Sequence, residues 1–297
     1  MTEPKDFYIF GSGISFSISP TIHNTGFTHH ALPHTYTIRE SASIDEVGRL
    51  IHAQSFGGAS VTMPHKLQVH KFCTEVSETA KAIGAINTLI PTGHEHGNSS
   101  IIGDNTDWSG LYAIIMKYTK TSPDGEGQGK SLKAGLVIGA GGASRAALYA
   151  MFKAGVQHIY LVNRTQSIAE NVRDDFRCSF NITVIPDLSE SSRPESPDII
   201  IATVPAETTS EEQFGSLFKD RSEGLCIDMS YKPRQTPLLT VAQRHSGWAT
   251  VTGVEVLLAQ AFDQFKLWTG LEPPREEMIE AVLAREAGVG RASLSML

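Results

Sequence analysis

Apolar and polar positions follow two different rhythms along the first third of the chain. Short apolar or alternating runs at 7–11, 34–40 and 57–62 predict β-strands. The segments between them, 20–27 and 44–53, have the amphipathic spacing of helices. A strand–helix succession of this kind predicts an α/β fold with a mostly parallel sheet.

The same alternation of strand-like and helix-like segments is found again further along the chain. A helix-like apolar run at 108–118 and a polar, glycine-rich stretch at 119–130 separate the two series. A helix is expected over 146–155, where Gly155 would end it. Further strands are predicted at 134–139, 158–163, 198–205, 225–231 and 248–253. The second series therefore predicts a second α/β unit.

The last clear helix has one apolar stripe. Thr252 and Glu255 have capping-box spacing just before it. The stripe consists of Val254, Leu257, Leu258, Ala261, Phe265 and Trp268. Gln260 lies at the edge of this stripe, where its side chain could reach into a cleft.

Composition narrows the class of protein. The 297 residues favour two domains as a soft prior, and a net charge of −7 provides no broad field for nucleic acid or anionic membranes. No apolar run approaches the roughly 18 residues that span a bilayer, and the first residues have no signal-peptide pattern. Cys73, Cys178 and Cys226 are far apart, so neither a disulfide framework nor a metal site is expected. We expect a cytoplasmic protein.

A glycine-rich turn follows the strand predicted at 134–139. In this context, strand then turn then helix, such a turn binds the pyrophosphate of a dinucleotide with its amides. The alternative is a purely structural turn. The candidate cofactor-binding positions are Gly139, Ala140, Gly141, Gly142 and Ala143.

The end of the next strand distinguishes between cofactors. NAD-binding proteins usually carry an acidic residue there for the ribose hydroxyl, whereas this chain has Asn163, Arg164 and Thr165. Because a guanidinium can bind a 2′-phosphate, the pattern predicts NADP. The alternative is that Arg164 is a solvated surface arginine.

Two serines precede the first predicted helix. Ser17 and Ser19 could bind a carboxylate beside the helix N-terminus. The alternative is that Ser19 is only the N-cap and Pro20 the first helical residue.

Lys66 and Asp107 each stand at an expected helix start. Lys66 would lie in the first turn of a helix, where the dipole disfavours an ammonium and so favours proton exchange. Asp107 precedes the helix at 108–118, so it could be only an N-cap, and Asp104 is a rival acid. On local chemistry alone, an exposed surface lysine is the favoured interpretation of Lys66, and Asp107 could be merely a helix cap.

On these motifs, the chain resembles shikimate dehydrogenases over nearly its whole length. It most resembles the arom-type members of the family in fungi. Eight motifs occur in the order found in that family. They lie at 17–24, 59–66, 84–88, 103–107, 139–146, 163–165, 228–239 and 253–270.

The resemblance implies two domains with a cleft between them. Residues 1–107, completed by 254–297, would form the substrate-binding and catalytic domain, and 108–253 a Rossmann-type NADP-binding domain. Lys66 and Asp107 fall on the catalytic lysine and aspartate. The positions that fall on substrate-binding residues are Ser17, Ser19, Thr62, Asn87, Tyr231, Gly253 and Gln260.

The implied activity is reversible NADP-dependent reduction of 3-dehydroshikimate to shikimate, in the pathway to chorismate and the aromatic amino acids. The alternatives are a quinate dehydrogenase and a catalytically silent sensor on the same fold. The expected partner is a small-molecule substrate, without nucleic acid or membrane, and the chain could be part of a larger multifunctional polypeptide. Four positions depart from the commonest family pattern: Gly13, Phe16, Ser60 and Ile168.

Overall fold

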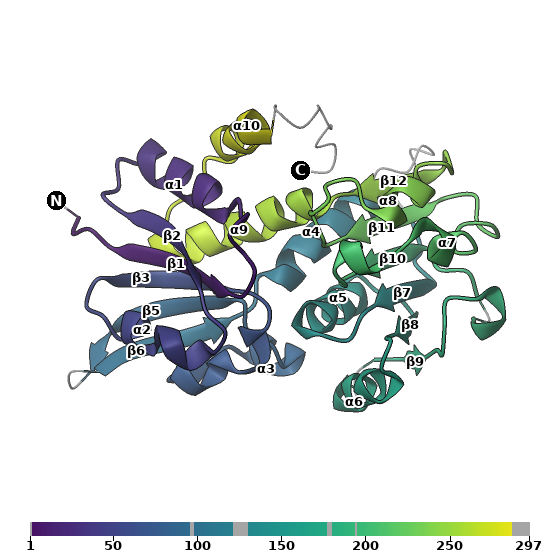
Figure 1. The fold of residues 1–297 in the computed structure, drawn as a ribbon, viewed down its shortest axis with the longest axis horizontal. Helices are drawn as coiled ribbons and strands as arrows, with labels where there is room; N and C mark the ends of the chain where they lie inside the picture. Colours follow the sequence, from purple (N-terminus) through teal and green to yellow (C-terminus); the bar gives the residue numbers. More distant parts are fainter. Residues whose placement is uncertain (1, 96–97, 121–129, 177–179, 194, 287–297) are drawn as a thin grey trace. The chain divides into compact units, whose positions relative to one another are not determined.

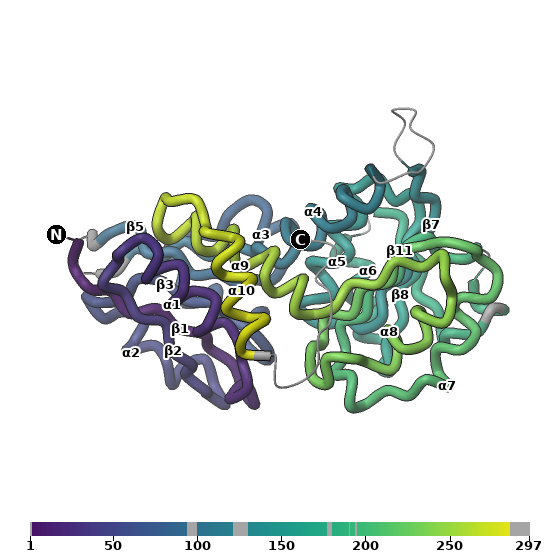
Figure 2. The backbone as a smooth tube through the Cα atoms, turned by 90° about the horizontal axis from the view of Figure 1, so that it is seen from above, coloured from purple at the N-terminus to yellow at the C-terminus, as the bar shows by residue number. Residues whose placement is uncertain are grey.

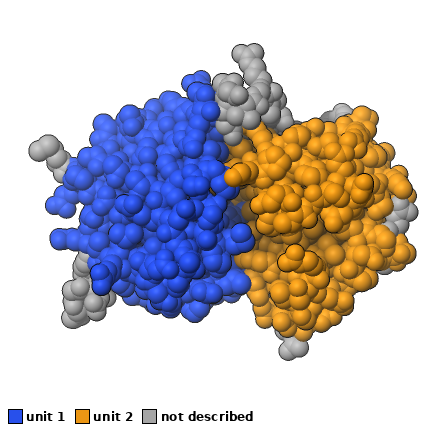
Figure 3. Space-filling model, in the orientation of Figure 1, with its two compact units in different colours: residues 1–109, 258–293 blue, residues 110–257, 294–297 orange. Residues whose placement is uncertain are grey.

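The chain forms two compact units, which Figure 3 shows in different colours. The computed structural model describes residues 2–95, 98–120, 130–176, 180–193 and 195–286. Unit 1 comprises residues 1–109 and 258–293, and unit 2 comprises residues 110–257 and 294–297. Each unit is built around a six-stranded sheet.

The sheet of unit 1 has the strand order β2-β1-β3-β5-β6-β4. Its strands are β1 (Asp6–Gly11), β2 (Thr35–Glu40), β3 (Phe56–Val61), β4 (Glu75–Val76), β5 (Thr88–Glu95) and β6 (Asn98–Asp104). Strands β1, β2 and β3 are parallel, whereas β5 is antiparallel to both of its neighbours. The carboxyl ends of β1, β3 and β6 and the amino end of β5 therefore share one edge. The sequence did not predict the β5–β6 pair.

Helices cover this sheet, and α1 and α10 lie side by side in both ribbon and tube views (Figures 1 and 2). The short elements are the 3₁₀ turns η1 (Ile44–Val47), η2 (His65–Leu67) and η3 (Val69–Phe72), with α2 (Gly48–Ile51) and α3 (Glu78–Ile83). The longer ones are α1 (Ser19–His29), α4 (Asp107–Lys120), α9 (Gly253–Thr269) and α10 (Arg275–Glu286). The unit boundaries fall within α4 and α9.

Helix α9 is buried more completely than its stripe predicted. Val254, Leu258, Ala261 and Phe265 have no exposed surface, as the stripe requires, but Gln264 is equally buried. The capping box is confirmed: the Thr252 amide donates to the Glu255 carboxylate over 2.8 Å, and the Glu255 amide donates back to the Thr252 hydroxyl over 3.4 Å. Further along, the Trp268 indole donates to the Leu89 carbonyl (3.0 Å), which ties α9 to β5.

The sheet of unit 2 is parallel throughout, with the order β12-β11-β10-β7-β8-β9. Its strands are β7 (Ala134–Ile138), β8 (His158–Val162), β9 (Ile182–Val184), β10 (Ile199–Ala202), β11 (Gly224–Asp228) and β12 (Trp248–Val251). Counted within the unit, this is the doubly wound order 3-2-1-4-5-6 of dinucleotide-binding Rossmann domains, which reverses between β7 and β10.

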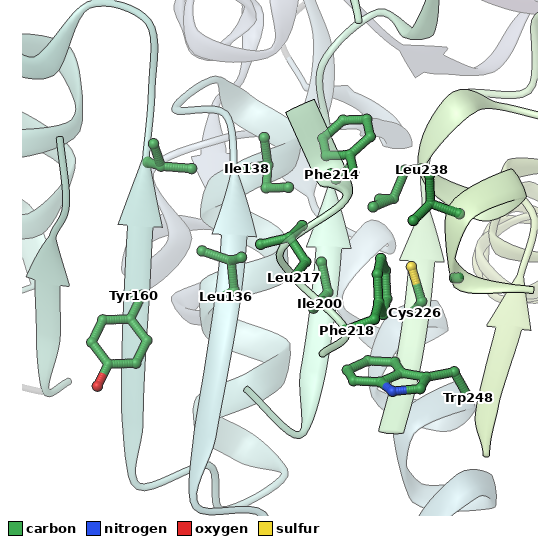
Figure 4. Packing of buried hydrophobic residues seen from close by; sticks show 14 of the residues in the cluster. Leu136, Ile138, Tyr160, Ile200, Phe214, Leu217, Phe218, Cys226, Leu238 and Trp248 are labelled. Carbon is green, nitrogen blue, oxygen red and sulfur yellow. The ribbon is translucent and has the colours of Figure 1, made fainter. Parts of the chain in front are cut away.

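Apolar side chains on one face of this sheet form a large core. Figure 4 shows Leu136, Ile200 and Cys226 on successive strands, facing Phe218 and Leu238. The helical elements of this unit are α5 (Gly142–Lys153), α6 (Gln166–Phe176), η4 (Glu190–Ser192), η5 (Ala206–Thr208), α7 (Glu211–Phe214) and α8 (Pro237–Ala242). The α/β architecture with a Rossmann-type unit is therefore as predicted.

Some of the sequence-based expectations concern residues that the structure does not describe. Cys178 and most of the glycine-rich stretch at 119–130 lie outside them, as do residues 287–297 of the predicted first domain. Cys73 is half-buried, Cys226 is buried, and both are free thiols. Among the described residues, no helix combines the length and apolar character needed to cross a membrane.

Candidate active site

The Lys66 ammonium and the Asp107 carboxylate form an ion pair in unit 1. Only 14% of the lysine side chain and 7% of the aspartate side chain are exposed, so water screens the pair poorly. An amine held in this way can exchange a proton with a hydroxyl group that comes within hydrogen-bond distance. The structure thus brings together the two residues that local sequence chemistry could not distinguish from surface and capping residues.

No α-helix begins at Lys66, and this expectation from the sequence is wrong. Lys66 lies in the three-residue 3₁₀ turn η2, which is too short to set up a helix dipole. The turn is anchored instead by its neighbour His65, which is buried and whose ring contacts the Ser41 hydroxyl over 2.9 Å. The Lys66 carbonyl also accepts from the Ile86 amide (2.9 Å). The lysine is therefore placed by tertiary contacts.

Asp107 is the first residue of α4, and capping is done by Asn105. The Asn105 side-chain oxygen accepts from the backbone amides of Asp107 (3.0 Å) and Trp108 (3.4 Å). The Asp107 carboxylate is thereby left for Lys66. The rival acid Asp104 accepts from the Ser77 hydroxyl at the start of α3.

Asn87 lies at the centre of the polar cluster, just before β5. Its amide nitrogen donates to Asp107 (3.0 Å), to the Thr106 hydroxyl (3.0 Å) and to the Gln260 side chain (3.2 Å). Its side-chain oxygen accepts from the Thr106 amide over 2.7 Å. Asn87, Asp107 and Gln260 are each 5% exposed or less. The edge that these strand ends share is therefore a hydrogen-bonded site that joins β5, α4 and α9.

Ser17 and Ser19 form a buried pair of their own after β1. Their hydroxyls lie 3.2 Å apart, and the Ser19 amide donates to the Ser17 hydroxyl over 3.3 Å. Helix α1 begins at Ser19 with Ile18 as its N-cap, so the capping alternative for Ser19 is wrong. Thr62, half-buried, follows β3 at the same edge of the sheet.

In unit 2, the glycine-rich turn has the geometry of a dinucleotide-binding loop. It joins the end of β7 to α5, at the point where the strand order reverses. Gly139 has φ 113°, which favours glycine, and a Cβ atom there would lie 2.4 Å from the Thr203 hydroxyl. A Cβ atom on Gly141 would meet open space, so a ligand has room to approach its backbone. Ser144, which replaces the usual third glycine, accepts from the Gly141 amide over 3.0 Å.

Residues 163–165 follow β8, beside the strand that carries this turn. The Asn163 side chain donates to the Thr165 carbonyl over 2.9 Å and so closes the loop. Arg164 is exposed, and no ion pair involves it among the described residues. Ile168 is 46% exposed and offers no second cation.

Tyr231 and Gly253 also lie in unit 2, and they follow β11 and β12 respectively. A Cβ atom on Gly253 would lie 2.6 Å from the carbonyl oxygens of both Met229 and Ser230, so only glycine allows this close approach. Asp228, at the end of β11, is buried, and burial raises the pKa of its carboxyl to about 6.

Sequence reasoning missed four polar residues of unit 1. Thr88, Thr106, Gln264 and His65 are all at least 98% buried and connect the candidate catalytic residues to one another or to the sheet. One signal could have found Gln264, because it stands one helical turn beyond Gln260 on the same helix. The other three belong to loops and strand ends whose contacts only the folded chain determines.

A Rossmann-type sheet with an open glycine-rich turn defines the class of dinucleotide-binding proteins. Three family models match the chain. The shikimate dehydrogenase substrate binding domain matches residues 9–89, the shikimate / quinate 5-dehydrogenase model matches 127–238, and the shikimate 5'-dehydrogenase C-terminal domain matches 253–283. The chain belongs to the shikimate dehydrogenase family.

Curated relatives and solved structures support the same family assignment. The pentafunctional AROM polypeptide of Malassezia globosa is 44% identical over 280 residues, which cover 91% of this chain but 17% of that polypeptide. The solved dehydroquinate dehydratase and shikimate dehydrogenase of S. pombe AroM is 37% identical, with a TM-score of 0.74, over 95% of this chain and 53% of that one. The Thermus thermophilus shikimate 5-dehydrogenase, solved with NADP(H) and shikimate, is 26% identical, with a TM-score of 0.73, over 95% and 99% of the two chains. The chain thus spans less than a fifth of the curated relative.

Proposed function

We propose that this chain catalyses the reversible NADP-dependent reduction of 3-dehydroshikimate to shikimate. The observation that carries the proposal is the poorly exposed Lys66–Asp107 pair, hydrogen-bonded to Asn87 at the carboxyl edge of the unit 1 sheet. Unit 1 would hold the substrate, and unit 2 would hold the cofactor.

The substrate is held by the polar groups along this edge. The Ser17 and Ser19 hydroxyls would bind the carboxylate of shikimate. Thr62, Asn87, Asp107 and Gln260 would orient the ring hydroxyls, and Tyr231 and Gly253 are predicted to contact the substrate as well. Because Asn87 and Gln260 are already fixed by hydrogen bonds, little side-chain entropy is lost when the substrate binds.

Lys66 moves the proton of the reaction. In shikimate oxidation, the lysine amine accepts the proton of the C3 hydroxyl as the C3 hydrogen departs with its electron pair. In the reverse direction, the ammonium returns that proton to the carbonyl oxygen. Asp107 orients the lysine and stabilises its charged form, which is the form that donates the proton when 3-dehydroshikimate is reduced.

The residues of unit 2 fit a bound NADP. The amides of residues 139–143 would bind the pyrophosphate, and Asn163, Arg164 and Thr165 would bind the adenosine 2′-phosphate. When bound, the nicotinamide ring supplies the hydride acceptor or donor. The complex of the Thermus relative with NADP(H) and shikimate supports this choice of cofactor and substrate.

A kinetic comparison of shikimate and quinate, each with NADP⁺ and NAD⁺, tests the proposal. We expect the largest kcat/KM for shikimate with NADP⁺. A larger value with quinate would make the chain a quinate dehydrogenase. Binding of shikimate without NADPH formation would make it a silent sensor.

Two further features of the setting remain predictions. The cytoplasmic location expected from the sequence is one. The other is membership in a larger polypeptide, for which the AROM relatives are the support, since the matching region forms 17% of the Malassezia polypeptide and 18% of the Schizosaccharomyces pombe one.

A further inference from the structure

A second glutamine on α9, Gln264, contacts residues of the candidate site. Its side chain has no exposed surface, and it stands one helical turn after Gln260. Its amide nitrogen donates to the Asn87 carbonyl over 3.2 Å and to the Thr88 hydroxyl over 2.9 Å. Its oxygen accepts from the Ser60 hydroxyl over 2.8 Å. Gln264 thus touches the residue that holds Asp107, although it has no contact with Asp107 itself.

Two backbone groups fix the directions of these hydrogen bonds. The Asn87 carbonyl can only accept, so Gln264 must present its nitrogen there and its oxygen to Ser60. The Thr106 amide can only donate, so Asn87 must present its oxygen to Thr106 and its nitrogen to Asp107. Neither amide can turn over without losing a buried hydrogen bond.

The hydroxyls between the two amides then have one arrangement each. Thr88 accepts from Gln264, so its own proton goes to the Asn87 oxygen, 2.7 Å away. Ser60 donates to Gln264, so it accepts from the Tyr36 hydroxyl, 2.6 Å away. All donors therefore point the same way, from Tyr36 through Gln264 and Asn87 to Asp107. Hydrogen bonds in such a chain polarise and strengthen one another.

We propose that Gln264 is a positioning residue of the reaction: it directs the Thr88 hydroxyl onto the Asn87 oxygen and so reinforces, together with the Thr106 amide, the orientation in which Asn87 donates to Asp107. The inference rests on the proposed function. It also gives a role to Ser60, one of the four positions that depart from the commonest family pattern. The Ser60 hydroxyl links Tyr36 to Gln264 behind the site.

The decisive variant is Gln264→Glu, which preserves size and shape. A protonated carboxyl accepts from Ser60 with one oxygen and donates its single proton from the other to Thr88, so it keeps the hydrogen bond to Thr88 and gives up the one to the Asn87 carbonyl. An ionised carboxylate has no proton to donate and faces the Asn87 carbonyl, so the Thr88 proton turns toward it. We therefore expect kcat/KM for shikimate within about threefold of wild type near pH 6 and roughly tenfold or more below it near pH 9, the scale of one buried hydrogen bond.

Two further variants separate positioning from stability. Gln264→Met removes the donor at every pH, so its loss relative to wild type should stay constant across the same range. Phe265→Leu is the matched control, because Phe265 is equally buried on the same helix and packs on Phe27 with ring centroids 5.7 Å apart. It should lower Tm while kcat/KM stays within about twofold of wild type at each pH, since a packing defect leaves the chain of donors intact.

The outcomes distinguish a failure of the proposed function from a failure of the positioning role of Gln264. A wild-type chain without turnover on shikimate contradicts the proposed function. The positioning role is contradicted if wild type turns over shikimate but the ratio of kcat/KM in Gln264→Glu to kcat/KM in wild type does not change with pH. This ratio is measured only where circular dichroism shows that the variant is folded. A double-mutant cycle adds a check, because Gln264→Met and Thr88→Val should cost together no more than the worse of them alone, whereas Gln264→Met and Ser17→Ala should multiply.

Discussion

At the scale of single residues, the Lys66–Asp107 pair carries the proposed chemistry. Lys66→Ala should lower kcat by about 10²–10⁴-fold, because it removes the proton-transfer group. The NADP dissociation constant should hardly change, since the predicted cofactor residues all lie in unit 2. Steady-state kinetics and a fluorescence titration with NADPH measure the two effects.

Lys71 provides the matched control for this substitution. It stands five residues away and pairs with Asp45 over 2.5 Å, with 40% of its side chain exposed. Lys71→Ala should leave kcat unchanged. A Lys66→Ala enzyme with wild-type turnover would refute the assignment of Lys66.

We predict that Arg164 determines the preference for NADP over NAD. Arg164→Glu should raise KM for NADP⁺ by about tenfold to a hundredfold, because charge-assisted hydrogen bonds to the 2′-phosphate are replaced by repulsion. KM for NAD⁺, which lacks that phosphate, should change far less. Arg173→Glu is the control, since Arg173 lies on α6 and pairs with its neighbour Asp174. Equal effects on both cofactors would assign Arg164 to the solvated surface.

At the scale of elements, we predict that His23 makes the stability of the packing around α1 depend on pH. Its ring is fully buried, stacks on Tyr36 with centroids 4.6 Å apart, and has no hydrogen-bond partner for either nitrogen among the described residues. Burial lowers the pKa of His23 from 6.5 to about 3. The imidazole is therefore neutral in the folded chain.

The unfolded chain takes up this proton near pH 6.5, whereas the folded chain does so only near pH 3. The free energy of unfolding should therefore fall as the pH drops below 6.5, by about 2 kcal/mol at pH 5 from this residue. Urea unfolding of wild type and His23→Leu at pH 7 and pH 5 measures the difference. Ile22→Val, a fully buried neighbour, should shift stability equally at both pH values. Identical pH dependence of His23→Leu and wild type would disprove the linkage.

The elements also show what could be predicted from the sequence. Strands β7 and β8 and helix α9 were predicted because each has an uninterrupted apolar pattern and a glycine or cap at its boundary. The β5–β6 pair was missed because it begins in the polar residues that form the site. Lys66 was given a helix start that tertiary contacts replace with a 3₁₀ turn. The polar network behind Asn87 is long-range, and Gln264 is 177 residues away in sequence from the Asn87 carbonyl it binds.

At the scale of the whole molecule, the two units should respond to pH in opposite ways. Burial raises the pKa of Asp228 in unit 2 from 3.8 to about 6, and hydrogen bonds from Thr236 and Ser230 offset this only in part. The folded chain therefore holds this proton at a higher pH than the unfolded chain does. The stability of unit 2 should fall as the pH rises from about 4 to 6 and level off above, by about 3 kcal/mol from this residue.

Asp228→Asn removes this titration and keeps an acceptor for the Ser230 amide. Relative to wild type, the variant should gain stability in unit 2 between pH 4 and pH 7. Hydrogen exchange at the amides of β10 and β11 reports on this unit, and exchange at β1 and β3 in unit 1 is the internal control. An equal gain in both units, or none in either, would show that the Asp228 carboxyl does not set the dependence.

The path of the chain through its two units imposes an order on biosynthesis. Residues 1–109 leave the ribosome first, followed by all of residues 110–257, and only then by the part of α9 that returns to unit 1. The Rossmann-type sheet can therefore close while the sheet that carries Lys66 still lacks the helix bearing Gln260 and Gln264. During that interval, the parts of β1 and β5 that later contact Trp268 are uncovered, so the first unit completes its core only after the second unit has been synthesised.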